Sequence, residues 1–416
     1  MFYNVNAKEK KLILLNIKNI SKKITGENKY LFDLRISLFC FFSSLFLAFP
    51  ALWIYLQDDF GEGRILGFIM QAENPLRKDL ILINKDWSVL EYRIFVPLIN
   101  KILGFRNYFV ILPALFCNFF NLYLCSKIFR EKTENLNLTL YSCFALSLSF
   151  FVVGPNVFWG TPDSVAFTLA LIPAAFNLPI SVWFLCLTSS LLVDERSIIS
   201  FIFLFFYNGR FFNKNLIDYF DLKKFIALIT GFSFWQLIRY FIDTGLIGNE
   251  TTNSEWFKNN IFKALRLYSP QDGWFGWIVN IFAAFKWIYF IPIILFFLLI
   301  KSVFEKRKTL SRKIKLNLFY WFIYLLLFLS WMVISIFNGD VHRTISFAFF
   351  FIIESINIFY IVNSKSTVKV MQLISVLMFL TPVFFLGSNG NYWDTSYSLQ
   401  IHFPFPAVML KTIFGS

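Results

Sequence analysis

The fold is decided by stretches such as residues 316–337, LNLFYWFIYLLLFLSWMVISIF, which contain no charged residue. A helix of about 20 mostly apolar residues is long enough to cross the hydrocarbon core of a bilayer. A block of Lys and Arg precedes this stretch at 301–315, and a short polar turn, Asn338 to Arg343, follows it. The same alternation recurs along the chain. It predicts an all-α, multi-pass transmembrane protein.

The composition of the whole chain agrees with a membrane protein. Of its 416 residues, 57% are hydrophobic and only 15% are charged, whereas a soluble domain has about 25% charged residues. The formal net charge of +14 could indicate nucleic-acid binding. We exclude that class because the basic residues form short blocks between apolar runs, as membrane topology requires.

Hydropathy and length predict about eleven transmembrane spans. The predicted spans are 34–56, 108–128, 138–154, 162–177, 178–194, 196–212, 225–242, 278–300, 316–337, 344–362 and 368–387. The three spans between 162 and 212 are short and nearly continuous, so one of them could be re-entrant.

The distribution of Lys and Arg predicts the orientation. Besides the N-terminal segment, the basic connections are 129–134, 209–224, 301–315 and 363–369. With eleven spans all of them fall on one side, which the positive-inside rule assigns to the cytoplasm. We therefore expect a bacterial inner-membrane protein with a cytoplasmic N-terminus and a periplasmic C-terminus.

The chain is predicted to form one transmembrane domain, residues 31–416, after a basic segment, residues 1–30. That segment is either an amphipathic helix on the inner surface or a disordered basic tail. The outer side receives the first outer loop, 57–107, a second loop, 243–277, and the tail, 388–416. The first outer loop contains apolar runs that are too short to span, so we expect interfacial helices there.

Five charged clusters fall on this outer side, and they contain the candidate site residues. The candidates are Asp58, Asp59, Glu62, Arg64, Arg93, Asp163, Asp194, Glu195, Arg196, Asp340, His342 and Arg343. Ionisable residues at or near membrane depth are expensive, which favours a functional role. Each cluster also has a structural interpretation: a span-ending acid, an interfacial anchor, a charged helix start, an ion-paired hairpin or a capped turn.

The residue types suggest the chemistry. Asp58, Asp59 and Glu62 are candidate catalytic carboxylates, since a carboxylate can take the proton of an attacking hydroxyl. Asp58 and Asp59 could instead hold a divalent cation, Mg or Mn. The remaining candidates mix Arg with carboxylates and His, which suits binding of a phosphate-bearing substrate. No Walker or Rossmann glycine pattern accompanies them, which argues against an ATP-driven pump.

The chain resembles the membrane-embedded glycosyltransferases of the C-type fold. The resemblance rests on Asp58-Asp59 just after the first span, on the interfacial segment that follows, and on four short motifs. These motifs are Tyr92-Arg93 with Pro97-Leu98, Thr161-Pro162-Asp163, Asp194-Glu195-Arg196 and Gly339-Asp340-Val341-His342-Arg343.

The resemblance implies transfer of a sugar from a polyprenyl-phosphate donor to a glycan or lipid-linked acceptor at the periplasmic face, in cell-envelope glycan assembly. It makes Asp58 or Asp59 the general base or metal ligand. It makes Arg93, Arg196 and Arg343 candidates for binding the donor phosphate.

Two other functions remain open. A polysaccharide polymerase or O-antigen ligase also uses lipid-linked substrates, but its largest outer loop usually lies late in the chain, and here the first outer loop is longest. A lipid-linked glycan transporter or flippase usually shows internal repeats and charges at the membrane midplane. Convergence of Arg196 and Arg343 with Asp58 or Asp59 in one site would favour the enzyme.

Overall fold

The structure is a computed structural model of the chain. It describes residues 29–56, 64–77, 92–157, 162–176, 178–207, 221–246, 270–304, 312–336, 341–388 and 397–402. The predicted N-terminal amphipathic segment lies outside these residues, as does most of the second outer loop.

The described chain is predominantly helical. Its longer helices are α2 (Lys29–Leu56), α6 (Leu112–Thr133), α12 (Leu222–Asp243), α14 (Pro270–Phe285), α15 (Phe290–Phe304), α16 (Arg312–Ile336) and α19 (Ser364–Leu380). Its shorter ones are α3 (Arg64–Glu73), α5 (Phe95–Leu103), α7 (Leu136–Ser147), α8 (Phe150–Val157), α9 (Asp163–Ala175), α10 (Ile180–Leu191), α11 (Ser197–Phe206), α17 (Val341–Ser346) and α18 (Phe349–Val362). Two 3₁₀ segments are η3 (Asn107–Ile111) and η5 (Lys286–Tyr289).

Five helical stretches are long and apolar enough to cross a membrane. They are 29–47, 107–133, 222–242, 278–301 and 318–335. Helices α7 and α8 make a sixth if they count as one span, since they meet at an angle of 47°. These stretches agree with six of the predicted spans and establish a multi-pass membrane architecture.

The predicted spans between 162 and 212 correspond to shorter helices. α9, α10 and α11 have 13, 12 and 10 residues. At 1.5 Å per residue even α9 is only about 20 Å long, which is less than the hydrocarbon core of about 30 Å. The predicted span 344–362 likewise contains a short helix, α18, which has 14 residues.

The all-α prediction misses a small β-ribbon near the C-terminus. Strands β1 (Val383–Ser388) and β2 (Tyr397–His402) pair in antiparallel register, with Val383 opposite His402. The predicted span 368–387 ends early because Pro382 cannot continue α19 and favours an extended conformation at Thr381. Thr381 indeed has φ −93° and ψ 119°.

Helix α6 lies at the centre, packed against α2, α7 and α9. A chain of buried amides crosses this core: Asn118 Nδ2 donates to Asn156 Oδ1 at 2.8 Å, and Asn156 Nδ2 donates to Ser44 Oγ at 3.0 Å. Polar side chains of this kind bridge helices where few other polar partners are available. They fix α2, α6 and α8 relative to one another.

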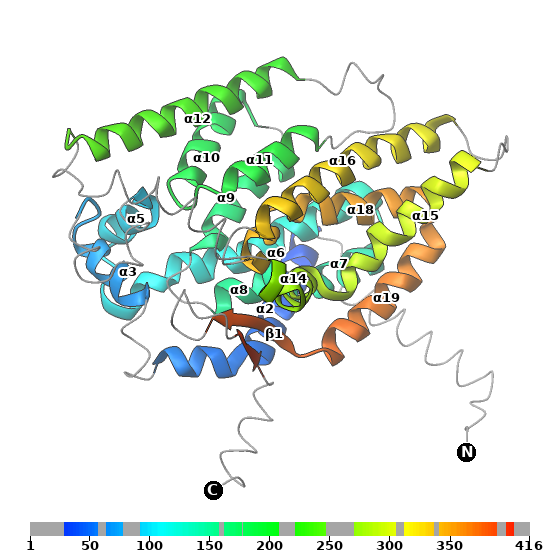
Figure 1. The fold of residues 1–416 in the computed structure, drawn as a ribbon, viewed down its shortest axis with the longest axis horizontal. Helices are drawn as coiled ribbons and strands as arrows, with labels where there is room; N and C mark the ends of the chain where they lie inside the picture. The colour runs from blue at the N-terminus through cyan, green and yellow to red at the C-terminus, as the bar shows by residue number, and fades with distance from the viewer. Residues whose placement is uncertain are drawn as a thin grey trace, which may run out of the picture.

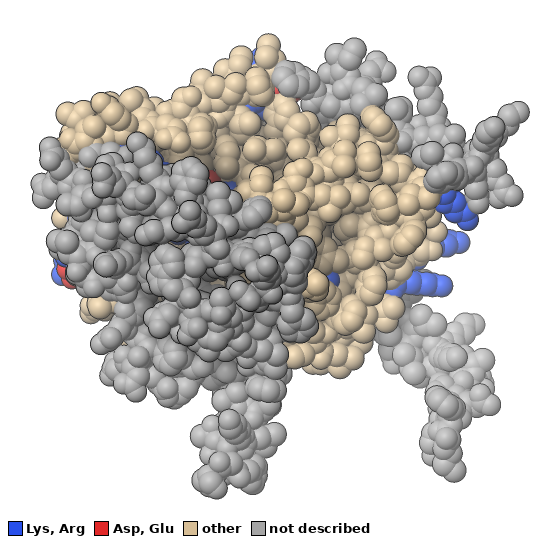
Figure 2. Space-filling model, viewed as in Figure 1, with Lys and Arg blue, Asp and Glu red and all other residues tan. Residues whose placement is uncertain are grey.

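The two ends of the molecule carry different elements and different charge. Figure 1 shows the ends of α15 and α18 and the starts of α16 and α19 at the right, and α3 and α5 of the first outer loop at the left. In Figure 2 Lys and Arg gather at the right-hand edge, and the rest of the described surface in this view is largely uncharged. Large apolar side chains cover this exterior, for example Phe297 and Val333, which are 64% and 56% exposed. Such a surface suits contact with lipid.

Candidate functional site

Six of the predicted site residues meet in one buried group, which we call the charge cluster. They come from four segments: the start of α5, the first turn of α9, the turn between α10 and α11, and α17. The members are Arg93, Asp163, Asp194, Glu195, Arg196 and Arg343. The sequence analysis named all six without knowing that they are neighbours.

Asp194 is the centre of the charge cluster. Its carboxylate is fully buried, and its Oδ2 lies 2.7 Å from Arg196 Nη2, 3.1 Å from Arg93 Nη2 and 3.2 Å from Arg343 Nη2. Burial alone would raise the pKa of Asp194, but Arg196, Arg93 and Arg343 together lower this pKa well below its ordinary value. Asp194 is therefore ionised and binds three cations at once.

Asp163 and Arg343 form a two-pronged ion pair across 180 residues of sequence. Arg343 Nη2 donates to Asp163 Oδ1 at 2.6 Å, and Arg343 Nε donates to Oδ2 at 2.5 Å. This fork geometry matches the planar guanidinium to the carboxylate. Asp163 is also the first residue of α9, where a negative charge complements the helix dipole. The charged helix start that the sequence allowed is therefore present, and the pair joins α9 to α17.

Arg93 and Glu195 form the accessible side of the charge cluster. Arg93 Nη2 donates to Glu195 Oε1 at 2.9 Å. The side chain of Glu195 is 39% exposed, while that of Arg93 is 8% exposed. Burial alone would lower the pKa of Arg93, but Asp194 and Glu195 raise it above its ordinary value. Arg93 thus stays charged at the edge of the cluster.

Arg196 connects the α10–α11 turn to α17. Its Nε and its backbone N–H both donate to Asp194 Oδ1, at 2.8 Å and 3.0 Å. Its Nη1 donates to Thr344 Oγ1 at 3.2 Å, and its guanidinium lies over the ring of Phe347. The ion-paired hairpin that the sequence allowed at 194–196 is therefore present, within a larger network.

Among the residues that the structure describes, the charge cluster is electrically balanced. Three Arg residues face three carboxylates, and every one of the six groups is paired. Breaking a buried ion pair by removing one partner is strongly destabilising, because the other charge stays buried without compensation. The cluster therefore clamps its four segments together, and Glu195 is the most exposed of its six members.

The other predicted site residues are placed as follows. His342 is buried beside Arg343, and its ring packs edge-on against Phe150 with centroids 4.3 Å apart. Arg64 is the first residue of α3. The remaining candidates, Asp58, Asp59, Glu62 and Asp340, lie outside the described residues.

The predicted metal site depends on Asp58 and Asp59, so the structure does not test it. Within the described ranges no group of three His, Cys, Asp or Glu residues could hold a metal ion. The charge cluster itself is unsuited to a cation because its carboxylates already bind Arg.

Two buried ion pairs near the C-terminal end of α6 were not predicted from the sequence. Arg130 Nη2 lies 2.8 Å from Asp33 Oδ2, joining α6 to α2. Lys132 Nζ lies 3.2 Å from Glu354 Oε2, joining α6 to α18. Glu354 sits in the middle of an apolar run, and that signal could have identified it.

A buried lysine, Lys286, was also missed. It lies inside the predicted span 278–300, which was treated as one continuous apolar helix. A lone Lys in such a run is a candidate for function by the same argument that selected the outer clusters.

No protein-family model matches this chain, and neither a curated protein nor a solved structure resembles it at a significant level. Its function must therefore be argued from its own residues. The charge cluster within a helical membrane protein is the main observation available for that argument.

Proposed function

We propose that this chain is a membrane-embedded glycosyltransferase that uses a polyprenyl-phosphate-linked sugar as its donor. The observation that carries the proposal is the charge cluster. Four segments remote in sequence bring six charged side chains together next to α5 of the first outer loop. A membrane protein keeps buried charges at a cost, which favours a role in function.

The proposal includes an eleven-span topology with the N-terminus in the cytoplasm of a bacterial cell. It is supported by the arrangement in Figure 1, where the helix ends that border the basic connections gather at one end of the molecule. The first outer loop, with α3 and α5, lies at the other end and would face the periplasm. There its two short helices would lie in the membrane interface.

The balanced charges refine the roles of the Arg residues. Arg196 and Arg343 are held by Asp194 and Asp163 inside the cluster, so we assign them to positioning. Arg93 is the Arg whose partner, Glu195, is partly exposed. A donor phosphate that displaces Glu195 would meet the guanidinium of Arg93, which can bind phosphate with paired N–H donors.

The proposed reaction is a direct displacement at the anomeric carbon. The acceptor hydroxyl forms a bond to that carbon while the bond to the phosphate oxygen breaks, and polyprenyl phosphate leaves. Asp58 or Asp59 takes the proton of the hydroxyl as general base. Arg93 stabilises the negative charge that develops on the leaving phosphate. Asp58 and Asp59 could alternatively hold Mg or Mn.

Single variants test this assignment: Asp58→Asn, Asp59→Asn and Arg93→Met, with Glu131→Gln as the control. The assay follows sugar transfer from a radiolabelled polyprenyl-phosphate sugar in membranes. We expect one Asp variant to lose at least about 100-fold in rate, in line with loss of a general base. Arg93→Met should lose both rate and donor affinity, and Glu131→Gln should keep full activity.

Three outcomes would reject parts of the proposal. If both Asp variants keep full activity, the catalytic assignment is wrong. If the purified protein in proteoliposomes moves the lipid-linked sugar between leaflets without chemical change, the chain is a flippase and not a transferase. A long polymeric product would instead indicate a polymerase or ligase.

A further inference from the structure

Lys286 occupies a break in a membrane-crossing stretch. Residues 278–301 are apolar enough to span, but the short 3₁₀ segment η5 interrupts them between α14 and α15. Lys286 opens η5 with a φ of +47°, a left-handed conformation that side chains with a Cβ rarely adopt. Strained backbone of this kind often marks a functional position.

The ammonium group of Lys286 is buried with little to compensate its charge. The residue is 2% exposed. Its Nζ donates to the backbone oxygen of Thr381 at 3.4 Å, just after the end of α19. No carboxylate lies within ion-pair distance of it among the residues that the structure describes, in contrast to every Arg of the charge cluster.

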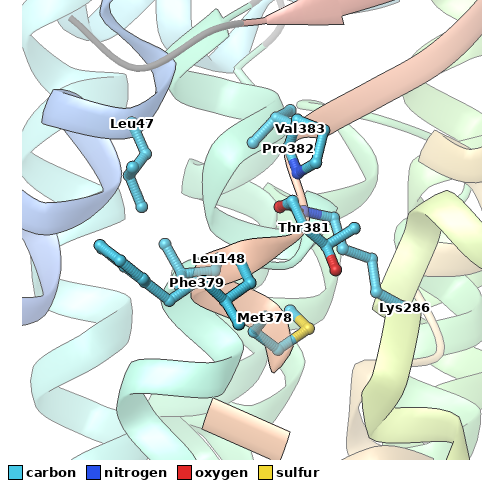
Figure 3. A pocket seen from close by; sticks show the side chains of 9 residues that line it. Leu47, Leu148, Lys286, Met378, Phe379, Thr381, Pro382 and Val383 are labelled. Carbon is cyan, nitrogen blue, oxygen red and sulfur yellow. Dashed lines mark hydrogen bonds between the residues drawn. The ribbon is translucent and has the colours of Figure 1, made fainter. Parts of the chain in front are cut away.

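A pocket of about 100 Å³ lies at Lys286. Its other walls are mainly apolar and come from α2, the α7–α8 break, the end of α19 and the start of β1. They include Leu47, Leu148, Met378, Phe379 and Val383. Figure 3 shows the Lys286 side chain extending from the α14–α15 side towards Thr381, with Leu47 and Leu148 on the other side of the pocket. A space of this size admits a few water molecules or one small anionic group.

The rim of the pocket is apolar and exposed. Phe379 and Leu380 line it and are 54% and 69% exposed, on the apolar exterior of α19. A ligand that reaches Lys286 past these side chains is better suited if it carries an apolar tail. The pocket is too small for a bulky head group, and an ammonium on a flexible stem is a common phosphate binder.

We propose that the Lys286 pocket binds the phosphate monoester head group of a membrane amphiphile, with phosphatidic acid as the chemical type. The phosphate would accept hydrogen bonds from Lys286 Nζ, and the acyl chains would lie along α19. Inorganic phosphate has the same phosphate chemistry and could bind in the same way. The experiment distinguishes it from the lipid. This site is distinct from the charge cluster and does not depend on sugar transfer.

The test uses the purified full chain in a non-ionic detergent, with thermal unfolding followed by Trp fluorescence. The probes are dioctanoyl phosphatidic acid, dioctanoylglycerol and inorganic phosphate. The proteins are wild type, Lys286→Met, Lys286→Arg and, as the matched control, Lys301→Met in the exposed last turn of α15. A further variant, Leu47→Trp, fills the pocket and keeps the lysine.

We expect phosphatidic acid to raise the unfolding temperature of wild type and Lys301→Met to the same extent. Lys286→Met and Leu47→Trp should each weaken its apparent affinity at least about tenfold, which corresponds to about 1.4 kcal/mol. Lys286→Arg should keep part of the binding because it keeps the charge. Dioctanoylglycerol and inorganic phosphate should have little effect at the same concentration.

Other results would overturn the proposal. Equal binding of phosphatidic acid to wild type and Lys286→Met would show that Lys286 is not the phosphate ligand. Equal stabilisation by dioctanoylglycerol would show that the phosphate is not recognised. If inorganic phosphate binds through Lys286 as tightly as phosphatidic acid does, the ligand is a free anion and the membrane source is wrong.

Discussion

The charge cluster and the Lys286 pocket bury positive charge in opposite ways. In the cluster three Arg residues face three carboxylates, and Asp194 alone contacts all three cations. In the pocket Lys286 contacts a backbone oxygen at 3.4 Å and shares the space with apolar side chains. The first arrangement satisfies its own charges, and the second does not.

This difference separates the positioning role, which we assign to Arg196 and Arg343, from a binding role. Burying a balanced network of charges has a desolvation cost. Removing one charged partner from the folded network also lowers stability, because the remaining charge stays buried without its partner. It therefore fixes the positions of its segments. An uncompensated buried cation destabilises the fold unless an anion joins it. Charge balance, more than charge itself, distinguishes the two sites.

The largest expected effect is that of Asp194→Asn. Removing the central carboxylate leaves three buried Arg residues with two carboxylates. We expect the free energy of unfolding to fall by about 3–5 kcal/mol, measured by titration with SDS in mixed micelles. Glu195→Gln is the matched control in the same cluster, because Glu195 is 39% exposed. It should cost about 1 kcal/mol or less. If Asp194→Asn costs no more than Glu195→Gln, the clamp interpretation fails.

The next effect concerns the pair between Asp163 and Arg343. Arg343→Met alone leaves Asp163 buried without its partner, and we expect a loss of about 3 kcal/mol. Combining it with Asp163→Leu removes both charges and leaves apolar groups. The double variant should be at least about 1 kcal/mol more stable than Arg343→Met alone. A double variant that loses the sum of both single effects would show that the pair is not a coupled unit.

The sequence located the charge cluster because its residues interrupt apolar runs. Asp194 and Arg196 stand out between two hydrophobic stretches, and Arg343 stands in a short turn. The contacts among them could not be predicted, since they depend on how α9, α10 and α17 pack. The balance of the cluster, which changes the role of Arg196 and Arg343 from phosphate binding to positioning, appears only when the partners are known.

Lys286, the break at η5 and the β-ribbon were not predicted from the sequence, and each has a physical reason. Lys286 was hidden because one charge in a long apolar run still leaves an average hydropathy high enough for a span. The break at η5 follows from the left-handed φ of Lys286, and nothing in the local sequence demands it. The β-ribbon was absorbed into the last predicted span, although Pro382 marks where that helix must end.

Lys286→Met tests the Lys286 pocket by its effect on the free energy of unfolding. Met is unbranched and fills space of similar length, while the uncompensated charge is removed. In detergent without added lipid, we expect the free energy of unfolding to stay the same or to rise by about 1 kcal/mol. A loss of more than about 2 kcal/mol in the same SDS titration would mean that the hydrogen bond from Lys286 to Thr381 stabilises the fold.

The smallest effect is expected for Glu131→Gln, because Glu131 is exposed. Lys127 Nζ lies 2.6 Å from Glu131 Oε1, one turn apart on α6, and the Glu131 side chain is 48% exposed. Such a pair contributes about 0.3–0.5 kcal/mol, and the order Lys before Glu is the less favourable one. Glu131 also lies in the last turn of α6, where its negative charge opposes the helix dipole. Because these terms cancel, the SDS titration should place Glu131→Gln within about 0.5 kcal/mol of wild type, at low and at high salt. An effect as large as that of Asp194→Asn would show that proximity of charges, and not their burial and balance, decides stability in this protein.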